Sequence, residues 1–224
     1  ALGTTALDAI TTGDYNLAVG YNALTANTSG GSNIAIGYGA LDASDTESNN
    51  LAIGVDALGG AIAQGDGNVA IGNYSMDANT SGDANVGIGY NSLSANTTGI
   101  RNIAMGYGAL DRSNDESNNL AIGVDALSGA ITGGEYNVAI GNYSLDALTS
   151  GDKNTGVGYN ALTGVTSGSW NTAVGHEAGK AMTTGADNTA FGLSAGAAIT
   201  TGSRNIALGG AALDNADAEN DNLA

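Results

Sequence analysis

The stretch Asn33-Ile-Ala-Ile-Gly-Tyr-Gly-Ala-Leu41 decides the fold, because versions of it recur along the whole chain. Between its Asn and its first Gly, large and small side chains alternate, which predicts a short β-strand. The pattern Asn-x-(Ala/Gly)-x-Gly begins at Asn16, Asn33, Asn50, Asn68, Asn85, Asn102, Asn119, Asn137, Asn154, Asn171, Asn188 and Asn205. Twelve copies of one strand motif predict a repeat architecture.

The spacing of the motif makes the chain one array. Successive motif asparagines are 17 residues apart, except for the 18 residues from Asn50 to Asn68 and from Asn119 to Asn137. A longer period is superimposed on this one, because the block from Asn33 matches the block 69 residues later. A thirteenth copy begins at Asn222, and the chain opens within the pattern. We therefore predict a single repeat array over residues 1–224, belonging to a longer fibre protein.

Each repeat has the length of one solenoid coil. The Ala-Leu pair seven and eight residues after Asn, as in Ala40-Leu41, predicts a second short strand. Segments such as Thr28-Ser29-Gly30 predict turns, and no segment has the periodicity of an amphipathic helix. The predicted fold is therefore all-β, a parallel β-solenoid of about twelve coils of 17–18 residues, with equivalent residues about 4.8 Å apart.

Two columns of identical residues are expected to hold the coils together. In a stack, each motif asparagine lies over the next, so its amide can bond neighbouring amides and turn backbone. This structural ladder is predicted to contain Asn33, Asn50, Asn68, Asn85, Asn102, Asn119, Asn137, Asn154, Asn171, Asn188 and Asn205. The glycine four residues after each asparagine has no exception. It predicts a left-handed turn or a close backbone approach at every level.

Composition excludes several classes of function. There are 22 acidic and five basic residues, for a formal net charge of −17, so nucleic acid and anionic membrane surfaces are not expected partners. The chain has no cysteine and no apolar run long enough to span a bilayer, so neither thiolate metal sites nor membrane insertion is expected in this segment. Thirty-seven glycines without a Gly-X-Y period exclude collagen.

The first strand predicts an oligomer. Its large positions are mostly Ile, Val or Leu, and the residue between them is Ala or Gly in all twelve copies, so neither face is polar. A strand that is apolar on both faces needs cover on both. The second strand of the same coil can cover one face, and we expect another chain to cover the other. The small side chains would suit a tightly packed axis shared by several chains.

The repeats resemble the head repeats of YadA-like trimeric autotransporter adhesins and related repeats in phage tail fibres. The resemblance rests on motifs such as Asn33-Ile-Ala-Ile-Gly-Tyr-Gly-Ala-Leu41 and covers essentially the whole chain. It implies a left-handed parallel β-roll, a homotrimer, and an extracellular fibre on a bacterial surface or in a virion tail that attaches to a cell-surface glycan or protein receptor. The coil is longer than the usual adhesin head repeat, which favours the fibre-shaft relatives.

Enzymatic solenoids fit less well. Hexapeptide acyltransferases need an apolar residue every six positions, but the positions that follow Ile36 at this spacing are Asp42 and Ser48. The right-handed β-helix lyases and hydrolases need larger coils and clustered catalytic charges. His176 and Glu177 superficially resemble an acid/base pair, but adjacent residues of a strand point to opposite faces and no nucleophile accompanies them. We therefore predict that the chain is not an enzyme and has no catalytic residue.

Acidic turns suggest the one candidate cofactor, a calcium ion. Three repeats carry acids in place of the Thr-Ser-Gly turn, and Ca²⁺ takes six to eight oxygen ligands. The candidate ligands are Asp45, Glu47, Asp115, Glu116, Asp217 and Glu219. No EF-hand spacing is present, and the alternative is a solvated acidic turn.

Aromatic and threonine columns suggest two further alternatives. Candidate surface contacts for a glycan or matrix protein are Tyr21, Tyr38, Tyr90, Tyr107, Tyr159 and Trp170, although a tyrosine at a half-buried corner commonly serves packing. Turn threonines recur at Thr11, Thr28, Thr80, Thr97, Thr149, Thr166, Thr183 and Thr200, which leaves open a monomeric solenoid such as an ice-binding protein.

Overall fold

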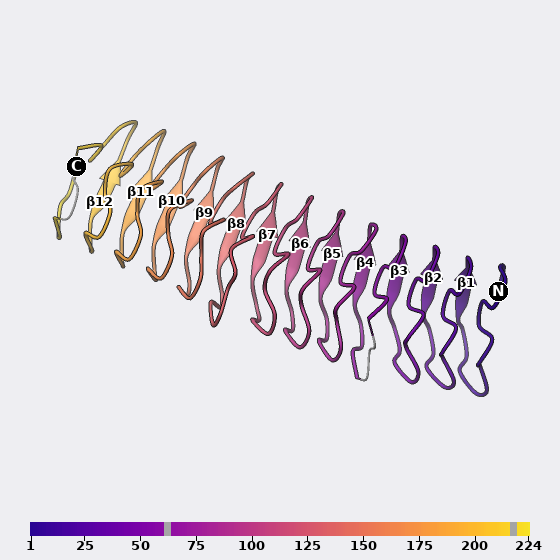
Figure 1. Ribbon diagram of the computed structural model, residues 1–224. Coiled ribbons are helices and arrows are strands. Elements are labelled where there is room, and N and C mark those ends of the chain that lie inside the picture. The colour runs from indigo at the N-terminus through magenta and orange to yellow at the C-terminus, as the bar shows by residue number, and fades with distance from the viewer. Residues whose placement is uncertain (61–63, 216–218) are drawn as a thin grey trace. The chain divides into compact units, whose positions relative to one another are not determined.

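A computed structural model describes residues 1–60, 64–215 and 219–224 and divides the chain into two units, Ala1–Asp115 and Glu116–Ala224. Every strand has three residues and occupies its own coil (Figure 1). The first unit contains β1 (Leu17–Val19), β2 (Ile34–Ile36), β3 (Leu51–Ile53), β4 (Val69–Ile71), β5 (Val86–Ile88) and β6 (Ile103–Met105). The second contains β7 (Leu120–Ile122), β8 (Val138–Ile140), β9 (Thr155–Val157), β10 (Thr172–Val174), β11 (Thr189–Phe191) and β12 (Ile206–Leu208).

The strands form a parallel β-solenoid, as predicted, and the described residues contain no helix. Within each unit, every strand pairs in parallel with the next strand along the chain. Equivalent residues face each other, as with Ile34 and Leu51 or Ala35 and Ala52. The 18-residue coil keeps this register, since Leu51 still pairs with Val69. Its additional residue therefore lies outside the strand, where it cannot reverse the inner and outer faces.

The small residue of each strand points into the core of its own coil. Ala18, Ala35 and Ala52 are 0% exposed, whereas the flanking Leu17 and Ile34 are exposed on the other face. The expectation that the small side chains line an axis shared between chains is therefore wrong. They make room for the fully buried leucines of the coil, such as Leu24 and Leu41. The large side chains of the strands form the outer face.

The predicted second strand is absent from the described residues. The Ala-Leu pair lies in a turn, in which Leu41 has a φ of 54° and Leu24 a φ of 55°. The residue two positions earlier is also left-handed, as at Asn22 and Gly39. A left-handed leucine costs roughly 1–2 kcal/mol, but burying its side chain contributes about 1.5–3 kcal/mol. Its N–H still donates to the next coil, from Leu41 to the Ala57 carbonyl at 3.0 Å.

A second inner column differs between the two units. It lies three residues after the left-handed residue of the inner turn, or four in the coil of Ile131, and it is buried in the coils named below, whereas Ile10 of the first coil is exposed. In the first unit it is polar, with Asn27, Ser44, Asn79, Asn96 and Ser113, and in the second it is apolar, with Ile131, Leu148, Val165, Met182 and Ile199. Where Gly179 and Gly196 replace leucine, Met182 and Ile199 fill the space: a Cβ on Gly179 would lie 3.1 Å from the Met182 Cε, and one on Gly196 3.2 Å from the Ile199 Cδ1.

The motif glycine is required for two reasons, as the sequence predicted. Gly20 and Gly37 have φ values of 139° and 142°, which side chains rarely tolerate. A Cβ on Gly20 would also lie 2.2 Å from the carbonyl oxygen of Gly37 in the next coil. The glycine column thus allows adjacent coils to approach at hydrogen-bonding distance.

We expect Gly54→Ala to destabilise the fold far more than Gly67→Ala. Gly54 has a φ of 141°, and its Cβ would lie 2.5 Å from the Gly72 carbonyl oxygen. Gly67 has a φ of 69° with no atom within 4 Å of its Cβ position, so its replacement adds backbone strain alone. Urea unfolding followed by circular dichroism should show a loss of more than about 3 kcal/mol for Gly54→Ala and about 1–2 kcal/mol for Gly67→Ala. Equal losses would contradict the packing argument.

Candidate functional site

The asparagine ladder uses every polar atom of the motif amide. In the first unit the backbone N–H of each asparagine donates to the Oδ1 of the preceding one, for example from Asn50 to Asn33 at 2.9 Å and from Asn85 to Asn68 at 2.9 Å. The Nδ2 atom donates within its own coil, from Asn68 to the Gly82 carbonyl at 2.8 Å. One side chain therefore closes a coil and joins it to the next.

The second unit repeats this arrangement. The bonds from backbone N–H to Oδ1 are 2.9 Å from Asn137 to Asn119, 3.0 Å from Asn171 to Asn154 and 2.9 Å from Asn205 to Asn188. The side chains of Asn33, Asn50, Asn68, Asn85, Asn102, Asn119, Asn137, Asn154, Asn171, Asn188 and Asn205 are all buried. The ladder is structural in both units, since its amide groups form hydrogen bonds within the fold.

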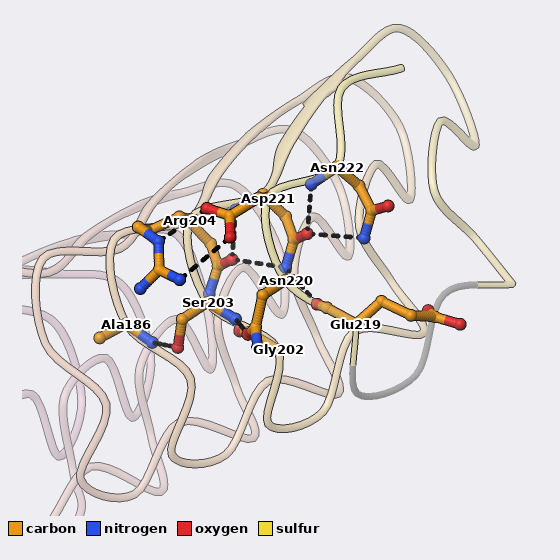
Figure 2. A network of polar contacts seen from close by, with 10 residues as sticks. Ala186, Gly202, Ser203, Arg204, Glu219, Asn220, Asp221 and Asn222 are labelled. Atoms are coloured by element: carbon orange, nitrogen blue, oxygen red, sulfur yellow. Dashed lines mark hydrogen bonds and ion pairs between the residues drawn. The ribbon is translucent and has the colours of Figure 1, made fainter.

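A second side-chain ladder, which the sequence analysis missed, lies two residues before the motif asparagine. Here the side-chain oxygen accepts from the backbone N–H of the preceding coil: Asp66 accepts from Ser48 at 2.7 Å, and Asp83 accepts from Asp66 at 2.8 Å. Figure 2 shows the same pattern near the C-terminus, where Ala186 N–H donates to Ser203 Oγ at 3.0 Å. The signal in the sequence is the recurrence of Ser, Asp or Asn at this position.

The first acidic turn uses its glutamate as a cap. The Glu47 Oε2 accepts from the Ser44 hydroxyl at 3.0 Å and from the N–H groups of Asp45 and Thr46 at 2.8 and 3.0 Å. In the preceding coil, Asn27 Oδ1 accepts from the Gly30 N–H at 2.9 Å instead. A serine and a glutamate thus replace an asparagine and a glycine in stabilising this turn.

The other candidate calcium ligands have separate surroundings. Asp45 accepts from the Thr28 hydroxyl, and Glu116 Oε1 accepts from the Gly133 N–H at 2.8 Å. Asp115 has interactions of its own, Glu219 is exposed, and Asp217 lies outside the described residues. Among the described residues, no three carboxylates or histidines converge in an arrangement that could hold a metal ion.

The tyrosines pack mainly on one another. Tyr21 stacks on Tyr38 and Tyr90 on Tyr107, each pair with ring centroids 5.4 Å apart, and Tyr159 stacks on His176 at 5.2 Å. Stacking covers ring faces that a sugar would otherwise use, so the exposed parts are largely ring edges and hydroxyl groups.

Trp170 is the most distinctive of the candidate contacts. It is 56% exposed, and its φ of 63° is the left-handed conformation that the residue before the motif asparagine adopts throughout the array, as in Lys153 with 57° and Asp187 with 59°. The Lys153 ammonium lies 4.1 Å from the centre of its ring. Beyond it in the same unit, Lys180 pairs with Glu177 at 2.7 Å and lowers the pKa of that carboxyl. His176 stacks on Tyr159 rather than pairing with Glu177 as an acid and a base would.

The turn threonines are also engaged by the backbone. The hydroxyl groups of Thr149, Thr166 and Thr183 donate to the threonine carbonyl of the next coil at 2.9, 3.3 and 3.1 Å. These bonds reinforce the stack and orient each hydroxyl along it. Hydroxyl groups ordered for water would instead point away from the chain.

The outer face is the largest unpartnered feature of the molecule. It consists of the first and third residues of each strand, and it carries no charged side chain on any described strand. Its members remain partly exposed: Leu17 by 44%, Ile34 by 38% and Ile103 by 39% in the first unit, and Phe191 by 60% and Leu208 by 57% in the second. Exposed apolar rows of this kind are typical of interaction surfaces, although Thr155, Thr172 and Thr189 interrupt the row in the second unit.

The remaining surface offers no enclosed site. The described residues form no cavity. They also contain no helix with the length and apolar character of a membrane span. Comparison with protein-family models, with curated proteins and with solved structures finds no significant match.

Three aspartates of the first unit interact unfavourably. Burial raises the pKa of Asp42, and the neighbouring Asp56 carboxylate raises it further. Burial also raises the pKa of Asp77, partly offset by a backbone hydrogen bond, and Asp56 again adds to the increase. At neutral pH these charges therefore destabilise the folded state.

Removal of the ladder amide should be costly. Asn68→Ala leaves the buried N–H of Asn85 without its acceptor and removes one of the two donors to the Gly82 carbonyl, the other being the Asn79 amide, so we expect a loss of about 2 kcal/mol in the free energy of unfolding. The control is Asn215→Ala, because Asn215 is exposed and, among the described residues, its amide bonds only the adjacent Asp214 carboxylate. That variant should change stability by less than about 0.5 kcal/mol in the same urea titration. A small effect of Asn68→Ala would show that the ladder is dispensable.

The raised pKa values of Asp42 and Asp77 predict that these two groups contribute more to stability in mild acid than at neutral pH. Below the ordinary pKa of aspartate, Asp42 and Asp77 are protonated in both the folded and the unfolded chain, and above their raised folded pKa they are ionised in both. Between these limits the folded chain binds more protons than the unfolded chain, so stability falls as pH rises. Asp42→Asn and Asp77→Asn should raise the urea midpoint at pH 7 and flatten its pH dependence. Asp8→Asn, at the equivalent position of the first coil but exposed, is the control. An Asp42→Asn variant that is less stable at pH 7 would refute the prediction.

Proposed function

We propose that the chain is a structural and adhesive segment of an extracellular homotrimeric fibre, of the kind found in phage tails or on bacterial surfaces, which projects or presents receptor binding. The observation that carries the proposal is the uncharged, apolar outer face of both units. Contact with another surface would stabilise a face of this kind, because burial of its apolar side chains away from water is favourable.

Charge favours a second copy of the chain as the cover. The chain carries a net charge of −17, so two copies repel each other wherever their acidic surfaces meet. The outer face is where this repulsion is least, because its two columns contain no acid or base on the described strands. A basic partner would be expected to meet acidic residues instead.

The role that follows is mechanical. Within each unit, strand pairing and the asparagine ladder bond every coil to the next, and the second side-chain ladder adds bonds between several of the coils. Such a unit resists extension and bending through many parallel hydrogen bonds and has no need of a catalytic group. The acidic surface outside the contact face prevents unspecific lateral association.

Direct binding by the repeats is a second candidate, and Trp170 is the residue that favours it. It is exposed, and it lies beside Lys153, one of only five basic residues in the chain. Exposed aromatic residues with a nearby charge are frequent in glycan and protein contacts.

The mass of the protein in solution tests the fibre proposal. We expect native mass spectrometry to give three times the chain mass of 21.8 kDa. Ile88→Asp places a charge at the centre of the outer face in β5 and should dissociate the assembly. Thr98→Asp adds the same charge on an exposed turn and should leave the mass unchanged. A stable monomer formed by the unmodified chain would sink the proposal.

A further inference from the structure

Tyrosines occupy the position after the motif glycine in pairs of adjacent coils of the first unit. Tyr21 and Tyr38 form one pair, and Tyr90 and Tyr107 form the other, 69 residues later. The rings of each pair stack with their centroids 5.4 Å apart, at interplanar angles of 14° and 9°. We call them the stacked tyrosine pairs.

The phenol groups of these pairs are accessible and are not used by the fold. The four residues are exposed by between 43%, at Tyr90, and 57%, at Tyr107. The described residues provide no hydrogen-bond partner for any of the four phenol hydroxyl groups, whereas the motif asparagines and the turn threonines bond to neighbouring coils. Packing accounts for the rings, but it leaves the hydroxyl groups without a structural role.

We propose that each stacked tyrosine pair is a site of oxidative cross-linking, at which a peroxidase with hydrogen peroxide joins adjacent coils by a dityrosine bond. Each phenol gives up one electron and one proton and becomes a phenoxyl radical, and one hydrogen peroxide takes up both electrons and both protons and becomes two waters. The ring carbons ortho to the two oxygens then form a carbon–carbon bond. The hydrogen on each of these carbons moves to the phenoxyl oxygen of its ring, which restores two phenols.

Stacking is the arrangement that this coupling requires. The unpaired electron of a phenoxyl radical lies in the π system, whose lobes stand perpendicular to the ring, so the new bond forms between ring faces. Each stacked pair already holds two faces toward each other, which replaces a chance collision by an oriented contact. Two other tyrosine pairs are almost as close but lie edge-on: Tyr74 and Tyr90 at 5.7 Å and 84°, and Tyr143 and Tyr159 at 5.9 Å and 90°.

The bond would connect two coils covalently. Tyr21 and Tyr38 are 17 residues apart, so their cross-link closes a loop and restricts the unfolded chain, as a disulfide does. The chain has no cysteine, so no disulfide within it can provide such a connection. Because both rings of a pair belong to one chain, the cross-link goes beyond the proposed fibre and forms whether or not copies of the chain associate.

Oxidation of the folded protein with hydrogen peroxide and a haem peroxidase tests the proposal. We expect dityrosine fluorescence, a product that migrates under denaturing conditions at the mass of one chain, 21.8 kDa, and a loss of two hydrogen atoms per link. Tandem mass spectrometry after proteolysis should assign the links to the stacked pairs at least about tenfold more often than to the edge-on pairs. Tyr38→Phe and Tyr107→Phe keep a ring for stacking but remove the phenol, so each should abolish the link of its own pair.

His176 offers a variant that should gain a cross-link. It stacks on Tyr159 with ring centroids 5.2 Å apart and an interplanar angle of 22°, at the position where the 69-residue period places Tyr38 and Tyr107. His176→Tyr should therefore create a dityrosine link to Tyr159 that the unmodified chain does not form. Tyr15 is the control for exposure alone, because it is 90% exposed and has no stacked ring among the described residues, so it should form no link within the chain.

The products decide the outcome. Circular dichroism confirms that each variant is folded before oxidation, and free tyrosine treated in the same way confirms that the oxidant is active. If the folded chain then forms no dityrosine, forms it only between chains, or forms it in edge-on pairs as readily as in stacked pairs, the proposal is refuted. The mass of the untreated protein in solution tests the fibre proposal separately, since links within one chain do not depend on association.

Discussion

The structure depends on the buried asparagine amide of each repeat. Turn N–H groups such as that of Leu41 bond the carbonyls of adjacent coils directly, but the N–H of the motif asparagine and the carbonyl of a glycine such as Gly82 bond to side chains instead. The amide compensates by donating across its own coil and accepting from the next asparagine, as Asn68 does between Gly82 and Asn85. Because a buried amide must be fully bonded, the position accepts no substitute of different shape or charge.

The hydrogen bonds of the asparagine amide also determine the conformation of the rest of the coil. Adjacent amides bond only if the coils keep a constant separation, and the motif glycine permits it, since a Cβ on Gly37 would lie 2.1 Å from the Gly54 carbonyl oxygen. The same close spacing leaves a thin interior, which the inward Ala35 and the left-handed Leu41 fill completely. The large strand residues then have no place inside, so they form the outer face.

Much of this could be read from the sequence, but not the direction of the side chains. The asparagine and glycine columns were predictable because the array shows no exception to them. The alternation of Ile34, Ala35 and Ile36 defines two faces without indicating which one is internal. The Ala40-Leu41 pair was predicted to be a strand because leucine rarely adopts a left-handed backbone, so an extended conformation was the expected one. A signal was present two residues earlier, where Asn22, Gly39 and Asp56 are residues that tolerate a positive φ.

Charged side chains are kept away from the outer face of each unit. Coil stacking repeats every property of one coil along the unit, so a single acidic residue on the outer columns would become a row of like charges. The acids lie instead in turns and in the second side-chain ladder, where Asp66 and Asp83 accept backbone hydrogen bonds. A repeat that places its charges in this way keeps the outer face of each unit uncharged while its turns carry the acidic surface.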